Sequence, residues 1–329
     1  MESTMSSLGE VGEFGLIAAI ALATRAGAGV EIGIGDDAAL IELPSGKALI
    51  TTDMAVEGVH FRTDWSSAYE IGRKCAAANL ADIAAMGGVT RAFVVAFAAP
   101  PHLSTEWALQ LTQGINDECE VEGASVVGGD TVRADSITIS ITAIGELSSM
   151  INAPVTRAGA QVGDLVYLLG QTGASAAGLE ILSRGISTAP GLVALHKVPK
   201  PPYELAREFA ALGATSMCDV SDGLVADLGH IADASGVTFE IDIDALDISD
   251  LVTAAEELEV DPHEWAISGG EDHAFAGTLP ATIKPPAGAR LIGEVRPRGE
   301  GAVISAGIAL TGYGHDHFSG LGINELGVN

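Results

Sequence analysis

The sequence has few cations. It carries 16 Lys and Arg against 44 Asp and Glu, which gives a formal net charge of −28. A charge of this sign repels the phosphates of nucleic acid and anionic membrane surfaces, so we expect neither as a direct partner. The acidic residues are spread over the whole length instead of forming a tail, and a solvated acidic surface explains most of them. An anionic ligand would need cations to bind such a protein.

Cysteines and long hydrophobic runs are also scarce. Cys75, Cys119 and Cys218 are odd in number and widely spaced, which excludes a CxxC metal pair and a secreted disulfide framework. The longest apolar run, residues 14–23, is too short for the ~20 residues that cross a bilayer. It follows acidic residues rather than a basic region, so it does not read as a signal peptide. We therefore predict a cytoplasmic protein with no membrane partner.

The length and the apolar pattern predict two domains, 1–149 and 150–329. A chain of 329 residues is about twice the usual size of one domain. The turn-rich segment 148–163 is the expected link between them. Because some expected strands are adjacent in sequence while others alternate with helices, we predict an α/β (α+β) fold with mixed sheets.

Apolar periodicity also places the individual elements. In the first domain we expect strands at 48–52, 91–98 and 137–145 and helices at 66–86 and 104–122. In the second we expect strands at 164–169 and 238–243 and helices at 175–184, 202–212 and 221–235.

Some acidic residues stand in glycine-rich or apolar surroundings, where solubility does not explain them. We expect each of them at a strand end or a helix start, where loops gather over a sheet and functional sites are common. They are Asp36 with Asp37, Asp53, Asp82, Asp130, and Asp219 with Asp222.

Several of these acids also have a structural interpretation. Asp82 follows Asn79 on one face of an Ala-rich helix, where it is either a surface acid or a paired or metal-bound one. Asp130 follows two glycines, which fit a tight turn as well as a close approach to a bound group. Ser221, between Asp219 and Asp222, is predicted to cap the following helix.

Taken together, these carboxylates predict a site for divalent cations. Two carboxylates ~4 Å apart repel by roughly 4 kcal/mol at an effective dielectric of ~20, and a larger group would raise each member's pKa. Oxygen ligands, here carboxylates with the hydroxyls of Thr51 or Thr52, suit Mg²⁺ better than zinc, because no Cys or His cluster accompanies them. Mg²⁺ commonly accompanies phosphates, so we predict several Mg²⁺ ions that hold a nucleotide.

The common nucleotide-binding motifs are missing. The sequence has no GxxxxGK[ST] loop, no GxGxxG after a strand, and no HRD or DFG set. The glycine-rich stretch 170–178 opens a helix and could cradle phosphates, although packing glycines explain it equally well. If the protein binds a nucleotide, it does so with a fold that lacks these common motifs.

The motifs resemble the thiamine-monophosphate kinases, whose superfamily includes aminoimidazole ribonucleotide synthetase and selenophosphate synthetase. The similarity extends almost from end to end. It is carried by 12–17 (GEFGLI), 33–39 (GIGDDAA), 51–53 (TTD), 58–61 (GVHF), 79–87 (NLADIAAMG), 128–131 (GGDT), 156–160 (TRAGA), 219–224 (DVSDGL) and 268–272 (SGGED).

The resemblance implies ATP-dependent phosphorylation of thiamine monophosphate by direct in-line transfer, and a set of site residues. The implied Mg²⁺ ligands are Asp37, Thr51, Thr52, Asp53, Asp82, Asp130, Asp219 and Asp222. The implied ATP contacts are Gly129, Asp130, Arg157 and Ser221. Arg157 is also implied to stabilise the negative charge of the transition state. The implied contacts of thiamine monophosphate are His60 and Glu271. No residue is assigned as a general base, because a phosphate monoester is already ionised near neutral pH.

The resemblance also implies a homodimer, in which the N-terminal sheets of two copies close into a barrel and the C-terminal α/β layer covers the nucleotide. One motif departs from the family. Where an aromatic residue normally stands before Asp-His-Phe, this chain has His315, so His315 or Tyr313 is the expected partner of the thiamine ring.

Two alternatives remain open. The chain could be another ATP-dependent member of the superfamily, although none of its cysteines lies in the glycine-rich N-terminal loop that selenophosphate synthesis would need. It could also be a non-catalytic binding protein for Mg-nucleotide or thiamine phosphate, whose mark would be the loss of a metal ligand. His60 could be an ordinary loop histidine and Arg157 a linker arginine in a salt bridge.

Overall fold

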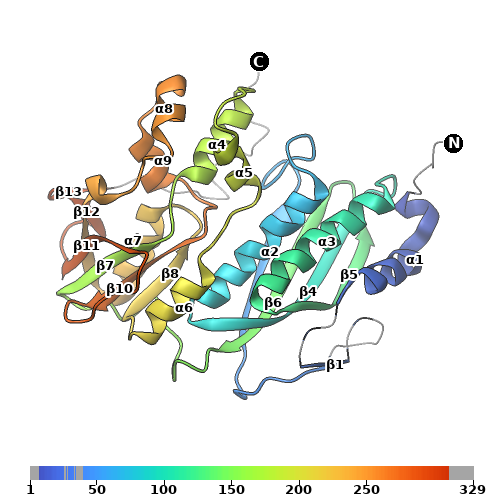
Figure 1. The fold of residues 1–329 in the computed structure, drawn as a ribbon, viewed down its shortest axis with the longest axis horizontal. Coiled ribbons are helices and arrows are strands. Elements are labelled where there is room, and N and C mark those ends of the chain that lie inside the picture. Colours follow the sequence, from blue (N-terminus) through green and yellow to red (C-terminus); the bar gives the residue numbers. More distant parts are fainter. Residues whose placement is uncertain (1–6, 26, 28, 33, 35–39, 311–329) are drawn as a thin grey trace.

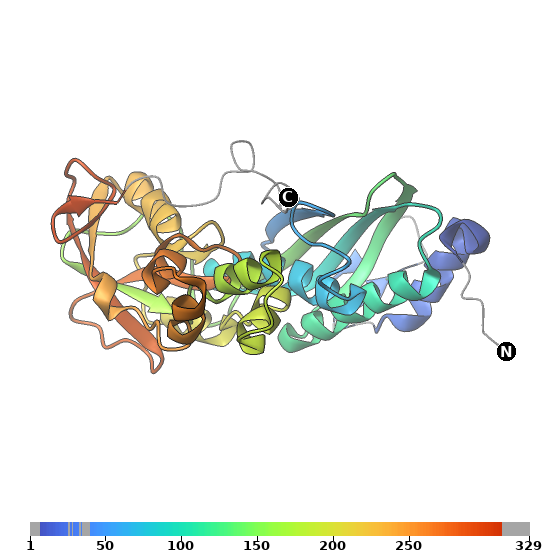
Figure 2. The same ribbon diagram turned by 90° about the horizontal axis from the view of Figure 1, so that it is seen from above.

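The computed structural model describes residues 7–310, apart from 26, 28, 33 and 35–39. These residues form two α/β halves that lie side by side along the long axis of the molecule (Figure 1, Figure 2). The N-terminal half begins with α1 (Leu8–Ala23) and the short strands β1 (Val30–Ile32) and β2 (Leu40–Ile41). Among the described residues, every helix is too short or too polar to cross a bilayer.

The N-terminal half is built on a four-stranded sheet with the order β3-β6-β4-β5. Its strands are β3 (Leu49–Val56), β4 (Gly88–Ala99), β5 (Ser125–Arg133) and β6 (Thr138–Leu147). β4 and β5 are parallel, whereas β6 pairs antiparallel with both β3 and β4. The sheet is therefore mixed, and β3 and β5 form its two edges.

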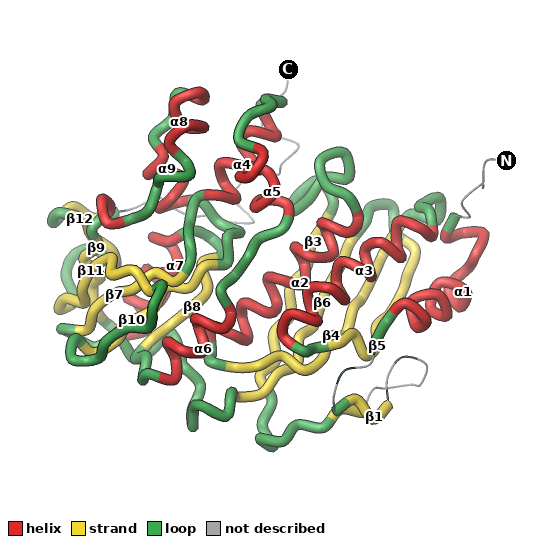
Figure 3. Tube along the Cα trace, viewed as in Figure 1, coloured by secondary structure: helices red, strands yellow, loops and turns green. Residues whose placement is uncertain are grey.

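Two long helices cover one face of this sheet (Figure 3). They are α2 (Ala68–Ala85) and α3 (Thr105–Glu122). Ser67 and Glu70 form a capping box that starts α2, and Ser104 caps α3. Phe93 and Phe97 of β4 and Ile141 of β6 are buried on the helix-covered face. The other face of the sheet has exposed apolar residues, with Ile50 and Met54 of β3 67% and 59% exposed.

The C-terminal half contains a seven-stranded sheet with the order β13-β12-β9-β11-β7-β10-β8. All pairs are antiparallel except β9 with β12. The strands are β7 (Asp164–Leu169), β8 (Ser216–Val220), β9 (Val237–Ile241), β10 (Ala274–Pro280), β11 (Ala289–Pro297), β12 (Val303–Ser305) and β13 (Ile308–Ala309). The helices are α4 (Ala174–Ser183), α5 (Pro190–Lys197), α6 (Tyr203–Ala211), α7 (Leu224–Ser235), η1 (Ile243–Ala245), α8 (Val252–Leu258) and α9 (Pro262–Ser268).

One hydrophobic core crosses the junction of the two halves. Tyr203 and Phe209 of α6 and Phe275 of β10 belong to the same buried cluster as Leu80 of α2 and Phe93 of β4. Burial of each large apolar side chain is worth roughly 1.5–3 kcal/mol. Helix α2 is consequently held against elements of both halves, which places its polar residues at the junction.

The expected mixed α/β fold is confirmed, and most expected elements agree with the structure within a few residues. Three expectations about the candidate site residues are wrong. Asp82 lies in the last turn of α2 rather than at a strand end or a helix start. Asp53 and Asp130 lie inside β3 and β5 rather than at strand ends, because both strands continue by pairing with β6 and β4. Ser221 does not cap α7, because the helix begins after Gly223, which has no side chain to cap it.

Candidate active site

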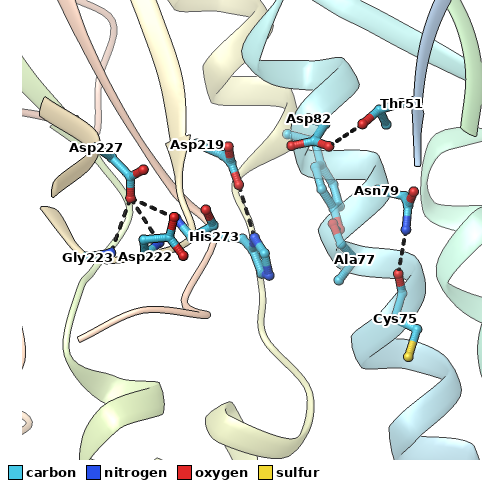
Figure 4. Close-up of polar contacts among 12 residues, drawn as sticks. Thr51, Cys75, Ala77, Asn79, Asp82, Asp219, Asp222, Gly223, Asp227 and His273 are labelled. Atoms are coloured by element: carbon cyan, nitrogen blue, oxygen red, sulfur yellow. Dashed lines mark hydrogen bonds and ion pairs between the residues drawn. The ribbon is translucent and has the colours of Figure 1, made fainter. Parts of the chain in front are cut away.

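Three carboxylates from both halves come close together at the junction. Asp53 lies on β3, Asp82 on α2 and Asp219 on β8, and the Thr51 hydroxyl donates to Asp82 Oδ2 at 2.6 Å (Figure 4). Burial raises the pKa of Asp82 to about 7, and the charges of Asp219 and Asp53 add to this rise. The pKa of Asp53 is also raised, chiefly by burial. Carboxylates that disfavour each other's ionisation form a site that favours a cation.

A buried histidine, which the sequence motifs did not single out, pairs with Asp219. His273 Nδ1 lies 3.2 Å from Asp219 Oδ2, and both side chains are buried. Burial works to lower the pKa of His273, but the hydrogen bond and charge of Asp219 outweigh it, so that the pKa is raised. The sequence feature that could have indicated His273 as a site residue is its position directly after Asp272 in a glycine-rich loop.

A second buried acid shapes the turn that carries Ser221 and Asp222. Asp227 Oδ2 accepts the backbone N–H groups of Ser221, Asp222 and Gly223 at 3.0, 3.0 and 3.2 Å (Figure 4). Asp227 thus satisfies the amides that precede α7, which Ser221 was expected to do. Ligand atoms of Asp222, Asp227 and His230 lie within 4.8 Å of one another, a spacing that a metal ion could bridge.

Glu271 lies in the loop between α9 and β10, and its carboxylate faces a lysine from the other half. Lys74 Nζ on α2 is 2.9 Å from Glu271 Oε2, and His196 Nδ1 is 4.0 Å from the same oxygen. Burial would raise the pKa of Glu271, but Lys74 and His196 hold it down at about 2. The Glu271 N–H donates to the Ser221 carbonyl at 2.8 Å, so this loop and the Ser221 turn are joined.

The glycine-rich stretch 170–178 binds an acid of the protein itself. Asp272 accepts the N–H groups of Gly173 and Ser175 at 2.6 and 2.7 Å. These two amides at the start of α4 are therefore already satisfied, which favours the packing explanation of the glycines over a phosphate cradle.

Thr52 and Asp130 do not join the carboxylates at the junction. Side chains of residues that pair across neighbouring strands point to the same face of a sheet. Asp53 pairs with the buried Ile141, so it is on the helix-covered face. Asp130 pairs with Ala96, which pairs with Ser140 and through it with the exposed Met54. Asp130 is therefore on the uncovered face and on the opposite edge strand, three strand spacings or roughly 14 Å from β3. The Thr52 hydroxyl is on the uncovered face too, where it donates to the Ile141 carbonyl.

Gly129 has a packing role that can be tested directly. A Cβ at Gly129 would lie 2.0 Å from the Val95 carbonyl oxygen, whereas one at Gly128 would meet nothing within 4 Å. We expect Gly129→Ala to lower the free energy of unfolding by about 2 kcal/mol or more, because β4 and β5 must separate. Gly128→Ala should change it by less than about 0.5 kcal/mol. Urea denaturation compares the two, and equal stabilities would contradict the packing role.

The remaining expected residues are placed as follows. Arg157 is exposed in the segment between β6 and β7, and its carbonyl accepts the Ser235 hydroxyl at 2.9 Å beside the end of α7. His60 lies in the turn after β3, where its Nδ1 accepts the Val56 N–H at 3.1 Å. Asp36, Asp37, Tyr313 and His315 lie outside the described residues.

Two family models match the chain, one in each half. The models for the N-terminal and C-terminal domains of AIR synthase related proteins match residues 35–147 and 161–304, which defines the class of protein. Within this class, the chain belongs to the thiamine-monophosphate kinase family. It is 43% identical to the Mycobacterium tuberculosis thiamine-monophosphate kinase over 309 residues, 93% of this chain and 91% of the relative.

Other relatives support the same family. The Escherichia coli thiamine-monophosphate kinase is 36% identical over 277 residues, 82% of this chain and 83% of that protein. A solved structure described as "AaThiL complexed with AMPPCP and TMP" has 32% identity and a TM-score of 0.78, and the alignment covers 96% of this chain and all of the other. The thiamine monophosphate kinase of Aquifex aeolicus, also solved, has a TM-score of 0.75 at 31% identity, with 81% of this chain and 90% of that chain covered.

Proposed function

We propose that this protein transfers the γ-phosphoryl group of ATP to the phosphate of thiamine monophosphate, which gives thiamine diphosphate and ADP. The observation that carries this proposal is the group of Asp53, Asp82 and Asp219 at the junction, in a chain from the thiamine-monophosphate kinase family. The relative solved with AMPPCP and TMP supports both substrates. The chain is accordingly a kinase that uses ATP.

The donor set fits Mg²⁺. The oxygen donors at the junction are carboxylates and the Thr51 hydroxyl, and carboxylates that raise one another's pKa are stabilised by a hard cation. Burial raises the pKa of the neighbouring Cys75 thiol to about 12, so this group is not a thiolate ligand, and His273 pairs with Asp219. We propose that Asp53, Asp82, Asp219 and Asp222 with Thr51 hold several Mg²⁺ ions, and that Asp37 joins them. The bound ions supply neutralisation of the phosphate charges. The protein carboxylates determine where the ions bind. Asp227 holds the turn that carries Asp222 by accepting the Asp222 N–H.

Other residues serve the two substrates in this proposal. Arg157 supplies positive charge to the transferring phosphoryl group, and Gly129 and Ser221 contact ATP. Glu271 and His60 bind thiamine monophosphate, with His315 at the ring. Attack of one phosphate on another is opposed mainly by charge repulsion, so positioning and neutralisation supply the catalysis and no general base is required.

The position of Asp130 supports a homodimer. Asp130 is on the opposite edge and face of the sheet from Asp53, so one copy cannot bring both to one metal ion. We propose that two sheets close into a barrel through their uncovered faces, on which Ile50, Met54 and Val132 are exposed. In such a barrel β3 of one copy lies beside β5 of the other, which brings the partner's Asp130 to the edge that carries Asp53. The two side chains still lie on opposite faces of the barrel wall, so we propose that they hold different Mg²⁺ ions of one shared site.

Mixed dimers test this shared site. Asp53→Asn and Asp130→Asn should each abolish turnover, but a purified mixed dimer of the two variants, carrying two different tags, should regain about half of the wild-type activity. The recovery is expected because both substitutions then fall in one site and leave the other intact. Turnover that stays absent in the mixed dimer would show that Asp53 and Asp130 act within one copy.

We also propose a division into an N-terminal domain, 1–149, that binds ATP and dimerises, and a C-terminal domain, 150–329, that completes the site. The separate sheets on either side of segment 148–163 support it. The acidic charge and the few cysteines support a cytoplasmic location.

The proposed activity is tested with thiamine monophosphate, ATP and Mg²⁺. We expect thiamine diphosphate and ADP in equal amounts, and no ADP with thiamine as acceptor, because thiamine lacks the accepting phosphate. Nucleotide binding without any thiamine diphosphate would exclude the thiamine reaction, and selenide and aminoimidazole precursors would then be the acceptors to examine.

A further inference from the structure

Lys74 connects the two halves of the molecule at the proposed substrate site. It lies on α2, two turns before Asp82, and its side chain is only 12% exposed. Its Nζ donates to Glu271 Oε2 at 2.9 Å, across 197 positions of sequence. A lysine that is nearly buried in a chain of this acidity needs an anionic partner, and Glu271 supplies it.

The loop that carries Glu271 has an unfavourable backbone. Glu271 and His273 have φ values of 64° and 52°, in the left-handed region that residues with a Cβ rarely adopt. The backbone is held within the C-terminal half, since Glu271 N–H donates to Ser221 and His273 N–H to Val220 at 2.8 and 3.2 Å. The Glu271 side chain is held differently, because its hydrogen-bonded anchor is Lys74 from the other half.

The other neighbour of Glu271 supports this division of roles. His196 is 96% buried, and its Nδ1 is within 3.0 Å of the Ser175 hydroxyl. Burial and the charge of Lys74 lower the pKa of His196 to about 3, so this histidine is neutral at physiological pH. Lys74 is therefore the cation that faces the Glu271 carboxylate at hydrogen-bond distance.

We propose that Lys74 is a positioning residue, which holds the Glu271 carboxylate in the orientation that binds thiamine monophosphate. This inference rests on the proposed function, because Glu271 receives its substrate role there. In this proposal Lys74 acts through Glu271, its hydrogen-bonded partner. Because α2 also carries Asp82, the same helix orients the substrate carboxylate and a proposed Mg²⁺ ligand.

Lys197 provides a matched control. It also forms an ion pair with α2 across the junction, to Glu70 at 3.8 Å, and its side chain is 19% exposed. It does not contact Glu271 in the structure. A general weakening of the contact between the halves should therefore affect Lys74→Met and Lys197→Met alike, whereas loss of Glu271 orientation should affect only Lys74→Met.

Steady-state kinetics of these variants test the proposal. We expect Lys74→Met to raise KM for thiamine monophosphate about 10-fold or more while KM for ATP changes less than about 3-fold. Lys74→Arg should restore part of the loss because it keeps the charge. Lys197→Met should resemble the wild type. Equal increases in both KM values, or equal effects of Lys74→Met and Lys197→Met, would overturn the positioning role.

A double variant separates positioning from direct contact. In a Glu271→Gln background, Lys74→Met should cause no further increase in KM, because the carboxylate it orients is already gone. A further loss of similar size would show that Lys74 binds the substrate itself and would overturn the proposal.

Calorimetry distinguishes failure of this inference from failure of the proposed function. Thiamine monophosphate is titrated into wild type and Lys74→Met in the presence of Mg²⁺ and a non-hydrolysable ATP analogue. Weaker binding only in Lys74→Met supports positioning even if turnover were absent, and equal binding by the two proteins contradicts it. Absence of thiamine diphosphate formation by the wild type contradicts the proposed function alone.

Discussion

Asp82→Asn should reduce kcat about 10³-fold while the protein remains folded. The charges of Asp219 and Asp53 act on Asp82, which also accepts the Thr51 hydroxyl, so its loss removes a proposed Mg²⁺ ligand. The fold should persist, because removing one acid from a crowded group relieves repulsion. Turnover is measured as thiamine diphosphate formed at saturating substrates, and circular dichroism reports the fold.

Asp233→Asn is the control, since this exposed acid pairs with Arg298 at the surface, where an ion pair contributes little. It should keep wild-type turnover. If Asp82→Asn kept most of its activity, the metal site would have to lie elsewhere.

The same carboxylate predicts how stability depends on pH when Mg²⁺ is removed. The pKa of Asp82 is about 7 in the folded protein and near 3.8 when unfolded, so ionisation favours the unfolded chain. This group's stabilising effect is fully present below pH ~4 and is lost as the pH rises towards ~7. Burial raises the pKa of Asp227 and of Asp272 to about 7, which acts in the same direction.

Urea denaturation in EDTA should therefore show a free energy of unfolding that falls between pH 5 and pH 7. Asp82→Asn should make this dependence shallower, and Mg²⁺ should restore stability at pH 7 in the wild type more than in the variant. A pH dependence in EDTA that is identical for the two proteins would show that Asp82 is ionised at no cost.

Arg157→Met should have the second large effect, a decrease of about 10³-fold in kcat with little change in stability. Arg157 is exposed and lies in the segment between the two sheets, where its backbone carbonyl, not its side chain, binds Ser235. Its side chain can therefore be removed without disturbing the core. Its guanidinium is the proposed source of positive charge for the transferring phosphoryl group.

Arg157→Lys separates charge from geometry. Lysine keeps the charge but cannot make the paired hydrogen bonds of a guanidinium to a phosphate, so it should recover only part of the rate. Full activity of Arg157→Met, measured at saturating ATP, would exclude the assigned role.

Much of the fold follows from local sequence patterns. The spacing of apolar residues predicts α2 and α3, and each of these helices begins after a capping serine. The ends of strands are less predictable. Asp53 and Asp130 interrupt apolar runs, but pairing with β6 and β4 continues the strands through them, and such pairing is a long-range property.

The site shows the same limit. Asp82 and Asp219 can be picked out from the sequence as candidate site residues, because each is a charged residue in an apolar stretch. The sequence does not reveal that Asp227 binds three amides, that His273 pairs with Asp219, or that Lys74 reaches Glu271, since each partner is fixed by tertiary packing. It also does not reveal that Asp130 faces away from Asp53, because that depends on the order of strands in the sheet.

The central claim is that phosphoryl transfer takes place at a site with several Mg²⁺ ions. It is tested most directly by measuring the rate of thiamine diphosphate formation against free Mg²⁺, with ATP and thiamine monophosphate both saturating. We expect the rate to keep rising well after all ATP is complexed with Mg²⁺, because the carboxylates at the junction must bind ions beyond the one that accompanies the nucleotide. A rate that reaches its maximum as soon as ATP is complexed would contradict a site with several metal ions.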